Sequence, residues 1–260
     1  MRGLITAATV ALICYGAVCA ALYLAQGRLL YLPTPDVNPP GATALRLVVG
    51  NASLKVWQLH PHARPALIYF GGNAEDAAAS LSDFDTEFPD RAVYVMNYRS
   101  YGGSTGRPSE AALVSDAHAL YDWVTAHHDP VAVVGRSLGG GVATALAADR
   151  PIERLILVTP CDSIANVAAE HLFWIPVRWL LKDHYDSLQR IGKVRAPVLA
   201  VIAERDEVVS RARSKALIRG IPSTLRHTFV IAHATHNDIS AFPGYFPALR
   251  EFLAGRVADQ

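Results

Sequence analysis

Short apolar runs alternate with longer amphipathic stretches along most of this chain. The runs at 45–49 and 54–59 predict an initial antiparallel pair of strands. Buried strands are predicted further along at 66–70, 92–97, 131–135, 155–159, 198–203 and 227–232. Between these runs lie helical patterns, the clearest at 110–127, which Ser109 is placed to cap. Strands that alternate with helices predict an α/β fold with a mostly parallel, eight-stranded sheet and helices on both faces.

The amino-terminal segment breaks this alternation because its apolar residues run without interruption. Residues 4–25 carry no charge, and a helix of that length, at about 1.5 Å per residue, spans the hydrocarbon core of a bilayer. We therefore predict a transmembrane anchor or signal segment at 1–28 and one globular domain at 29–260. The prolines within 33–40 suit a linker between the two, since they cannot continue a helix.

Two alternatives for this segment remain open, a cleaved signal peptide and a buried core helix. Ala17-Val18-Cys19-Ala20 approximates a small-x-small cleavage site only poorly, so an uncleaved single-pass membrane anchor is the favoured hypothesis. Arg2 and the amino terminus together carry slightly more positive charge than Arg28. This difference favours a domain on the extracytoplasmic side of the membrane.

Charge and cysteine content argue against a nucleic-acid partner and against a disulfide framework. Lys and Arg total 24 against 23 Asp and Glu, a formal net charge of +1, so no nucleic-acid partner is expected. The chain has three cysteines, and Cys14 and Cys19 lie within the apolar segment. A disulfide framework is therefore not expected in the domain.

A glycine-flanked serine is the strongest chemical motif in the chain. The apolar run 131–135 leads into Gly135-Arg136-Ser137-Leu138-Gly139, which fits the G-x-S-x-G pattern of a nucleophile elbow. A helix is predicted downstream at 142–148. Glycines at 139–141 disfavour a helix start, so close backbone approach is the better reason for them. The alternative is a glycine-rich turn that binds nothing.

Polar residues follow the predicted strands where each one ends. Asn73 follows 66–70, and Ser137 follows 131–135. Asp206 and His236 follow the last two predicted strands. The carboxyl ends of parallel strands share one edge of a sheet, which is where ligands bind. A serine hydroxyl needs a neighbouring base, and a histidine base needs an acid to orient it, so these residues could form a nucleophilic site.

The order serine, acid, histidine along the chain is that of α/β-hydrolases. Further motifs are, in chain order, Tyr69-Phe70-Gly71-Gly72-Asn73-Ala74, the stretch from Asn97-Tyr98-Arg99 to Pro108-Ser109-Glu110, Glu204-Arg205-Asp206-Glu207-Val208-Val209 and Thr235-His236-Asn237-Asp238. From about Leu29 to its end, the chain therefore resembles the α/β-hydrolase superfamily, and within it the small membrane-anchored bud-emergence-like and protein depalmitoylase branch. Gly71 and Asn97 depart from that branch, which has histidine and aspartate at these positions.

The resemblance implies that residues 29–260 form an α/β-hydrolase fold, and that this fold has only a minimal cap. It assigns Ser137 as nucleophile, His236 as general base and Asp206 as the acid that orients the histidine. The oxyanion would be held by the backbone N–H of Leu138 and by one from the Gly72-Asn73 turn. The implied reaction is cleavage of a carboxylic ester or thioester through an acyl-enzyme, without a cofactor or a metal.

Other side chains compete for these roles. Asp162 could be the acid in place of Asp206, although it could equally cap a helix with Ser163. His233 lies near His236 and could be the base. The run His127-His128-Asp129 could bind a metal. Cys161 could be a nucleophile, although a small core residue is the favoured interpretation. Glu204 and Asp238 are expected to be solvated or capping carboxylates.

An aromatic segment bears on the substrate. Residues 171–181 include Phe173, Trp174 and Trp179, and they form either a core-packing helix or a short cap that lines an acyl pocket or leans on the bilayer. The expected partner is a small-molecule or lipid-like acyl substrate, or an acylated protein, with the membrane reached through the amino-terminal segment. A serine aminopeptidase-like amide hydrolase and a non-catalytic membrane-tethered binding protein are the alternative functions.

Overall fold

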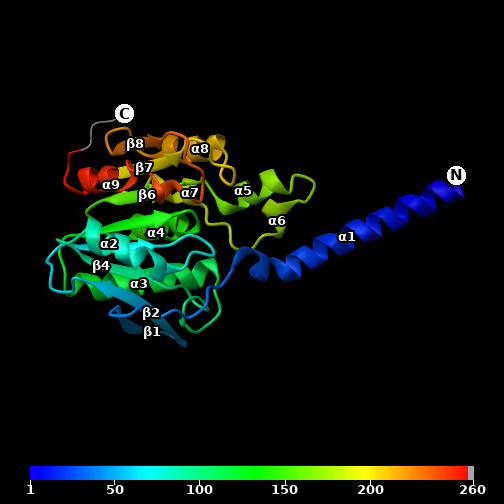
Figure 1. The fold of residues 1–260 in the computed structure, drawn as a ribbon. Coiled ribbons are helices and arrows are strands. Elements are labelled where there is room, and N and C mark those ends of the chain that lie inside the picture. Colours follow the sequence, from blue (N-terminus) through cyan, green and yellow to red (C-terminus); the bar gives the residue numbers. More distant parts are fainter. Residues whose placement is uncertain (257–260) are drawn as a thin grey trace.

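A computed structural model describes residues 1–256 and shows one eight-stranded sheet (Figure 1). The strands are β1 (Thr43–Val49), β2 (Ala52–Leu59), β3 (Ala66–Phe70), β4 (Ala92–Met96), β5 (Val131–Arg136), β6 (Leu155–Val158), β7 (Val198–Ala203) and β8 (Arg226–Ile231). Their order across the sheet is β1-β2-β4-β3-β5-β6-β7-β8. The pairs β1–β2 and β2–β4 are antiparallel, whereas the pairs from β4 to β8 are parallel. The predicted mostly parallel sheet is confirmed.

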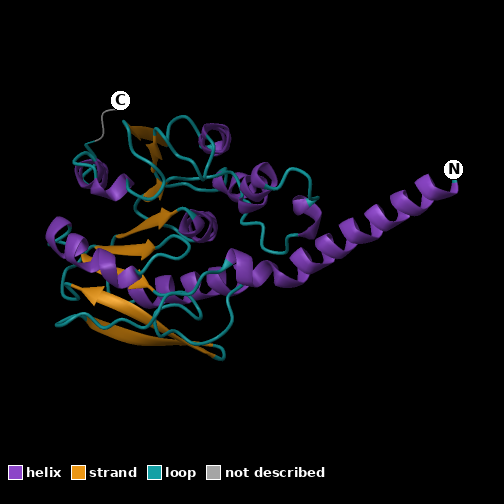
Figure 2. Cartoon of the chain, turned by 45° about the vertical axis from the view of Figure 1, so that its right-hand side comes forward, coloured by secondary structure: helices purple, strands orange, loops and turns teal. Residues whose placement is uncertain are grey.

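Helices cover both faces of this sheet (Figure 2). The helices are α1 (Arg2–Leu30), α2 (Leu81–Glu87), α3 (Glu110–Thr125), α4 (Leu138–Asp149), α5 (Ile164–His171), α6 (Val177–Leu180), α7 (Ser187–Ile191), α8 (Arg211–Gly220) and α9 (Tyr245–Leu253), with 3-10 turns η1 (Ala77–Ser80) and η2 (Ile239–Ala241). Side chains from α3, α4, α7 and α8 share one core cluster with Ile68 and Phe70 of β3. Those from α2 and α9 share the other with Leu67 and Tyr69. Alternate residues of one buried strand thus supply both cores.

Local signals place the long helix α3. Ser109 is its N-cap, and the Ser109 side chain accepts a hydrogen bond from the backbone N–H of Ala112. Leu113, Ala117 and Leu120 lie on its buried face. The prediction that Ser109 caps this helix is confirmed. The helix ends at Thr125, two residues earlier than the periodicity suggested.

The helix after Ser137 begins earlier than predicted. α4 starts at Leu138 and not at 142, so the three glycines form its first turn. A Cβ on Gly139 would lie 2.1 Å from the carbonyl oxygen of Phe70, and a Cβ on Gly135 would lie 2.4 Å from that of Gly139. Close backbone contact between the elbow and its neighbours therefore overrides the low helix propensity of glycine.

The amino-terminal helix α1 projects from the domain (Figure 1). It is long and apolar enough to cross a membrane, with a mean hydropathy of 2.1 in its most apolar window, and none of that window is buried. The alternative of a buried core helix is therefore wrong for this structure. Only its carboxyl-terminal part contacts the domain extensively, through side chains such as Tyr23, Gln26 and Leu30.

The aromatic segment at 171–181 does not form a single core-packing helix. α5 ends at His171, a turn follows, and α6 is only four residues long. Phe173 and Trp179 are 85% and 89% exposed, and both belong to a short excursion between β6 and β7. We call residues 164–181 the cap. In Figure 1 the cap lies beside α1.

Candidate active site

Three loops at the carboxyl edge of the sheet bring Ser137, Asp206 and His236 together. Ser137 follows β5, Asp206 follows β7 and His236 follows β8. The Ser137 Oγ lies 3.0 Å from His236 Nε2, and His236 Nδ1 lies 2.9 and 3.0 Å from the two Asp206 carboxylate oxygens. A ring whose Nδ1–H donates to the carboxylate leaves Nε2 free to accept the serine proton. The His236 and Asp206 side chains are each 7% exposed, which shields their interaction from solvent.

Ser137 sits in a strained backbone conformation. Its φ of 51° and ψ of −115° lie outside the regions that L residues favour. A strained turn of this kind costs about 1–3 kcal/mol and persists because the surrounding structure imposes it. Here β5 enters the turn, α4 leaves it, and the Ser137 N–H is held by the carbonyl of Val158. The serine side chain is thereby held between strand and helix at the start of α4, where the helix dipole favours negative charge.

The carboxylate of Asp206 is fixed by its own loop. Its Oδ1 accepts hydrogen bonds from the backbone N–H groups of Val208 and Val209, at 2.9 and 2.7 Å. The backbone N–H of His236 donates to Glu207 Oε2 at 3.2 Å. The acid and histidine loops therefore hold one another through main-chain contacts as well as through the pair itself.

A cavity of about 350 Å³ opens beside Ser137 and His236, and its wall includes Gly72, Asn73 and Val208. Leu138 is the first residue of α4, so its N–H has no acceptor within the helix. The N–H of Gly72 already donates to Glu75 Oε2 at 2.7 Å. Of Gly72 and Asn73, Asn73 is therefore the better candidate to donate its backbone N–H toward the cavity.

An ion pair that was not predicted from the sequence ties the loops of this cavity together. Arg136 NH1 lies 3.5 Å from Glu75 Oε2, and Arg136 NH2 donates to the carbonyl of Asn237 at 2.9 Å. Tyr69 donates its hydroxyl proton to the other Glu75 oxygen at 2.6 Å. Burial is the largest single influence and lowers the pKa of Arg136, but the Glu75 carboxylate together with Tyr69 and Tyr245 outweighs it, so the pKa of Arg136 is raised. The signal in the sequence was a charged residue at the end of an apolar strand, inside the G-x-S-x-G motif.

The two departures from the resembled branch have structural roles here. Asn97 is buried and its amide donates to the carbonyl of Gly102, which closes its own loop. The carbonyl of Gly71 accepts a hydrogen bond from the hydroxyl of Tyr98. Neither residue lines the cavity beside Ser137.

The competing acid and base lie in contacts of their own. Asp162 pairs with Arg213 at 2.9 Å and accepts from the backbone N–H of Ser163, so it acts as a buried structural carboxylate. His233 is exposed, and its ring contacts Arg205 and not Ser137. Glu204 accepts a hydrogen bond from the backbone N–H of His233, as a capping carboxylate does.

The proposed metal ligands are engaged elsewhere. The His128 ring is buried against the hydroxyl of Tyr94, and the His127 ring stacks on Trp123. Among residues 1–256, no group of three or more His, Cys, Asp or Glu side chains is arranged to hold a metal ion.

Cys161 is a buried core residue, and burial raises the pKa of its thiol to about 12. At neutral pH the thiol is therefore protonated and a poor nucleophile. If the site hydrolyses esters, Cys161→Ala should keep turnover within about threefold of the wild-type value, because the Cys161 side chain packs with Val167, Val209 and Ile164 and has no contact with the serine. Ester turnover per folded molecule checks this. A loss comparable to that of Ser137→Ala would contradict it.

The model of the alpha/beta hydrolase family matches residues 60–255. This chain belongs to that family. An uncharacterized protein of Mycobacterium tuberculosis is 35% identical over 97% of this chain and 95% of its own length. Protein bem46 of Schizosaccharomyces pombe is 32% identical over 75% of this chain and 69% of its own length, in agreement with the resemblance to the bud-emergence-like branch. The Pyrococcus furiosus esterase Pf2001 shares the fold, with a TM-score of 0.67 and 16% identity over 86% of this chain and 97% of that structure.

Proposed function

We propose that this alpha/beta hydrolase is a serine hydrolase that cleaves a carboxylic ester or thioester. Ser137 attacks the acyl carbonyl while His236 takes the serine proton at Nε2. Asp206 keeps the imidazole in the required tautomer and stabilises the imidazolium that forms. His236 then donates the proton to the leaving oxygen or sulfur, and water releases the acyl group from Ser137. The single observation that carries this proposal is the 3.0 Å contact between Ser137 Oγ and a histidine already paired with a carboxylate.

Negative charge on the tetrahedral oxygen would be stabilised by the N–H of Leu138 and by that of Asn73. Both belong to rigid elements, the first turn of α4 and the loop pinned by Glu75. Donors fixed in advance need no reorganisation when charge develops, and one such donor elsewhere contributes about 2.7–4 kcal/mol.

The direct test is covalent labelling of the purified full chain with a fluorophosphonate probe, together with hydrolysis of nitrophenyl acetate. We expect the wild-type chain to be labelled and active, and Ser137→Ala to be neither, because only an activated serine reacts with this probe. Turnover of aminoacyl-naphthylamides above that of esters would instead indicate an amide hydrolase. Labelling that persists in Ser137→Ala would overturn the proposal.

The side chain of Asn73 offers a second test. Its Oδ1 accepts hydrogen bonds from the N–H of Leu32, the N–H of Ala74 and the hydroxyl of Tyr101, at 2.7–3.0 Å. We expect Asn73→Ala to lower kcat by roughly 10- to 100-fold with a smaller change in KM, because the loop that supplies the oxyanion donor loses its fastening. Steady-state ester kinetics measure both. An unchanged kcat would remove Asn73 from the proposed site.

We also propose that α1 anchors the domain to a membrane as a single-pass helix. The support is its uncharged stretch at 4–25, its mean hydropathy of 2.1 and its exposure. An anchored site would act on substrates that partition into the bilayer, which agrees with a lipid-like acyl substrate.

A further inference from the structure

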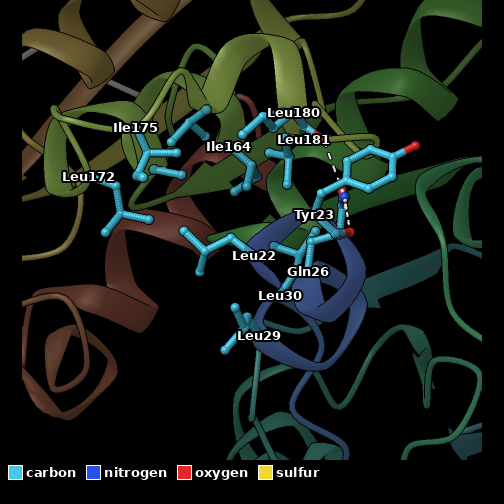
Figure 3. A pocket seen from close by; sticks show the side chains of 12 residues that line it. Leu22, Tyr23, Gln26, Leu29, Leu30, Ile164, Leu172, Ile175, Leu180 and Leu181 are labelled. Carbon is cyan, nitrogen blue, oxygen red and sulfur yellow. Dashed lines mark hydrogen bonds between the residues drawn. The ribbon is translucent and has the colours of Figure 1, made fainter. Parts of the chain in front are cut away.

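An apolar groove of about 220 Å³ lies between the carboxyl-terminal part of α1 and the cap. Figure 3 shows Leu22, Leu29 and Leu30 of α1 on one side and Ile164, Leu172 and Ile175 of the cap on the other. All six are aliphatic. The groove is therefore suited to hydrocarbon.

The one amide side chain in the wall is already satisfied by main-chain groups. Gln26 Nε2 donates to the carbonyls of Tyr23 and Leu180, and Gln26 Oε1 accepts from the N–H of Lys182. The contacts of Gln26 with Leu180 and Lys182 fasten α1 to the end of the cap and to the residue that follows it, and the ammonium of Lys182 lies 4.4 Å from the centre of the Tyr23 ring. The groove is thus preformed and presents no unpaired amide to an occupant.

The cap also reaches along α1 into its apolar stretch. The hydroxyl of Tyr15 donates to the carbonyl of Trp174 at 2.9 Å, and Tyr15 lies within 4–25. When α1 spans a bilayer, this contact places the cap loop at the depth of the lipid chains. The exposed ring of Phe173 is apolar and suits that environment, and the exposed ring of Trp179 suits the interface between lipid chains and headgroups.

Positive charge lies beside the groove. Arg178 and Lys182 are exposed and flank the lining residues Leu180 and Leu181. Exposed cations next to an apolar surface attract anionic lipid headgroups, by about 1 kcal/mol for each residue near the membrane surface. This pairing of charge and hydrocarbon matches a phospholipid.

A short segment of chain links the groove to the cavity beside Ser137. Leu30 lines the groove. Two residues later, the backbone N–H of Leu32 donates a hydrogen bond to Asn73 Oδ1, and Asn73 lines the cavity. Two residues of chain span at most about 7 Å. An acyl chain whose ester end lies at Leu30 would therefore come close to Asn73, the proposed oxyanion donor.

We propose that the groove between α1 and the cap binds an acyl chain of a bilayer phospholipid and delivers its ester carbonyl to Ser137. This proposal rests on the proposed function. In the reaction the bond between the acyl carbon and the lysolipid oxygen breaks, and a bond between the acyl carbon and Ser137 Oγ forms. The serine proton passes through His236 to the lysolipid oxygen. Water then hydrolyses the acyl-enzyme, which gives a fatty acid and free Ser137.

The first experiment measures chain-length preference with nitrophenyl esters from acetate to laurate, using the full chain in vesicles of phosphatidylcholine and phosphatidylglycerol. We expect kcat/KM to rise about fourfold per methylene until the groove is filled. Ala168→Trp, which places a large ring at a lining position, is expected to lower the laurate-to-acetate ratio at least tenfold. Ala169→Trp, the next residue of α5 but not a lining residue, is the matched control and keeps the ratio.

Dividing by acetate turnover removes any general loss of folding or of Ser137 reactivity. An Ala168→Trp ratio equal to that of Ala169→Trp would overturn the groove assignment. A flat chain-length profile with acetate turnover that still requires Ser137 would overturn the groove alone. Acetate turnover that survives Ser137→Ala would instead refute the proposed function.

The second experiment identifies the source of the acyl chain by fatty-acid release from labelled phosphatidylglycerol in the same vesicles. We expect release by the wild-type chain, none by Ser137→Ala, and at least tenfold less by Ala168→Trp than by Ala169→Trp. Turnover of a palmitoylated cysteine peptide without release from phospholipid would show that the acyl chain comes from a protein, and would overturn the phospholipid assignment.

Discussion

Ser137→Ala is expected to lower kcat for ester hydrolysis on the order of 10⁵- to 10⁶-fold, to the residual rate supplied by binding and oxyanion stabilisation. His236→Ala should cost about as much, because a serine hydroxyl without its base is a weak nucleophile. The double variant should lose little more than either single variant, since the two side chains act as a unit. Turnover of nitrophenyl acetate, with intact folding verified by circular dichroism, measures all three.

The neighbouring carboxylates supply the control for this prediction. Asp206→Asn should lower kcat by about 10⁴-fold, because the amide no longer holds His236 Nδ1 as a proton donor. Asp162→Asn should change kcat per folded molecule little, since Asp162 contacts Arg213 and Asn166 and not His236. A larger loss of kcat in Asp162→Asn than in Asp206→Asn would show that the wrong carboxylate has been assigned to orient His236.

Gly139→Ala is expected to destabilise the domain by about 3 kcal/mol or more, although alanine is the better helix former. The new Cβ would lie 2.1 Å from the carbonyl oxygen of Phe70 and 2.6 Å from that of Gly71. Both atoms are main chain, at the end of β3 and the start of the loop that carries Asn73. The backbone must move to admit the methyl group, and overpacking of this kind commonly costs 1–3 kcal/mol and occasionally more.

Gly140→Ala is the matched control, one residue along the same helical turn. Its Cβ would lie 3.8 Å from the carbonyl oxygen of Gly135 and 3.9 Å from a methyl group of Leu157, which are ordinary contacts. This substitution should stabilise the protein by about 0.4–1 kcal/mol, because alanine loses less backbone entropy on folding. Urea unfolding of the full chain in detergent measures both. Equal unfolding midpoints for the two variants would disprove close contact at Gly139.

Strand positions followed closely from the sequence. The runs 66–70 and 198–203 coincide with β3 and β7, and the other predicted strands differ by one or two residues at their ends. A strand buried on both faces must be apolar throughout, so its pattern survives whatever packs on it. The helix α4 was harder to predict, because its start is imposed by close contact with β3 and opposes local propensity.

The position of the cap could not be predicted from the sequence. Its aromatic residues fitted a core helix as well as they fitted an exposed excursion, because an apolar side chain does not specify its partner. The contacts that decide its place run from Tyr15 and Gln26 of α1 to Trp174 and Leu180, more than 150 residues away.

By itself the sequence determined the chemical groups and their order: a serine in a glycine-rich turn, then an acid, then a histidine, each after a predicted strand, behind an apolar segment long enough to cross a bilayer. Only the tertiary structure decided that Asp206 and not Asp162 meets His236, that Glu75 and Arg136 join the loops, and that α1 and the cap enclose a groove. The reason is that side-chain type and strand order are local properties. A 3.0 Å contact between residues 99 positions apart depends on how the intervening strands and helices pack.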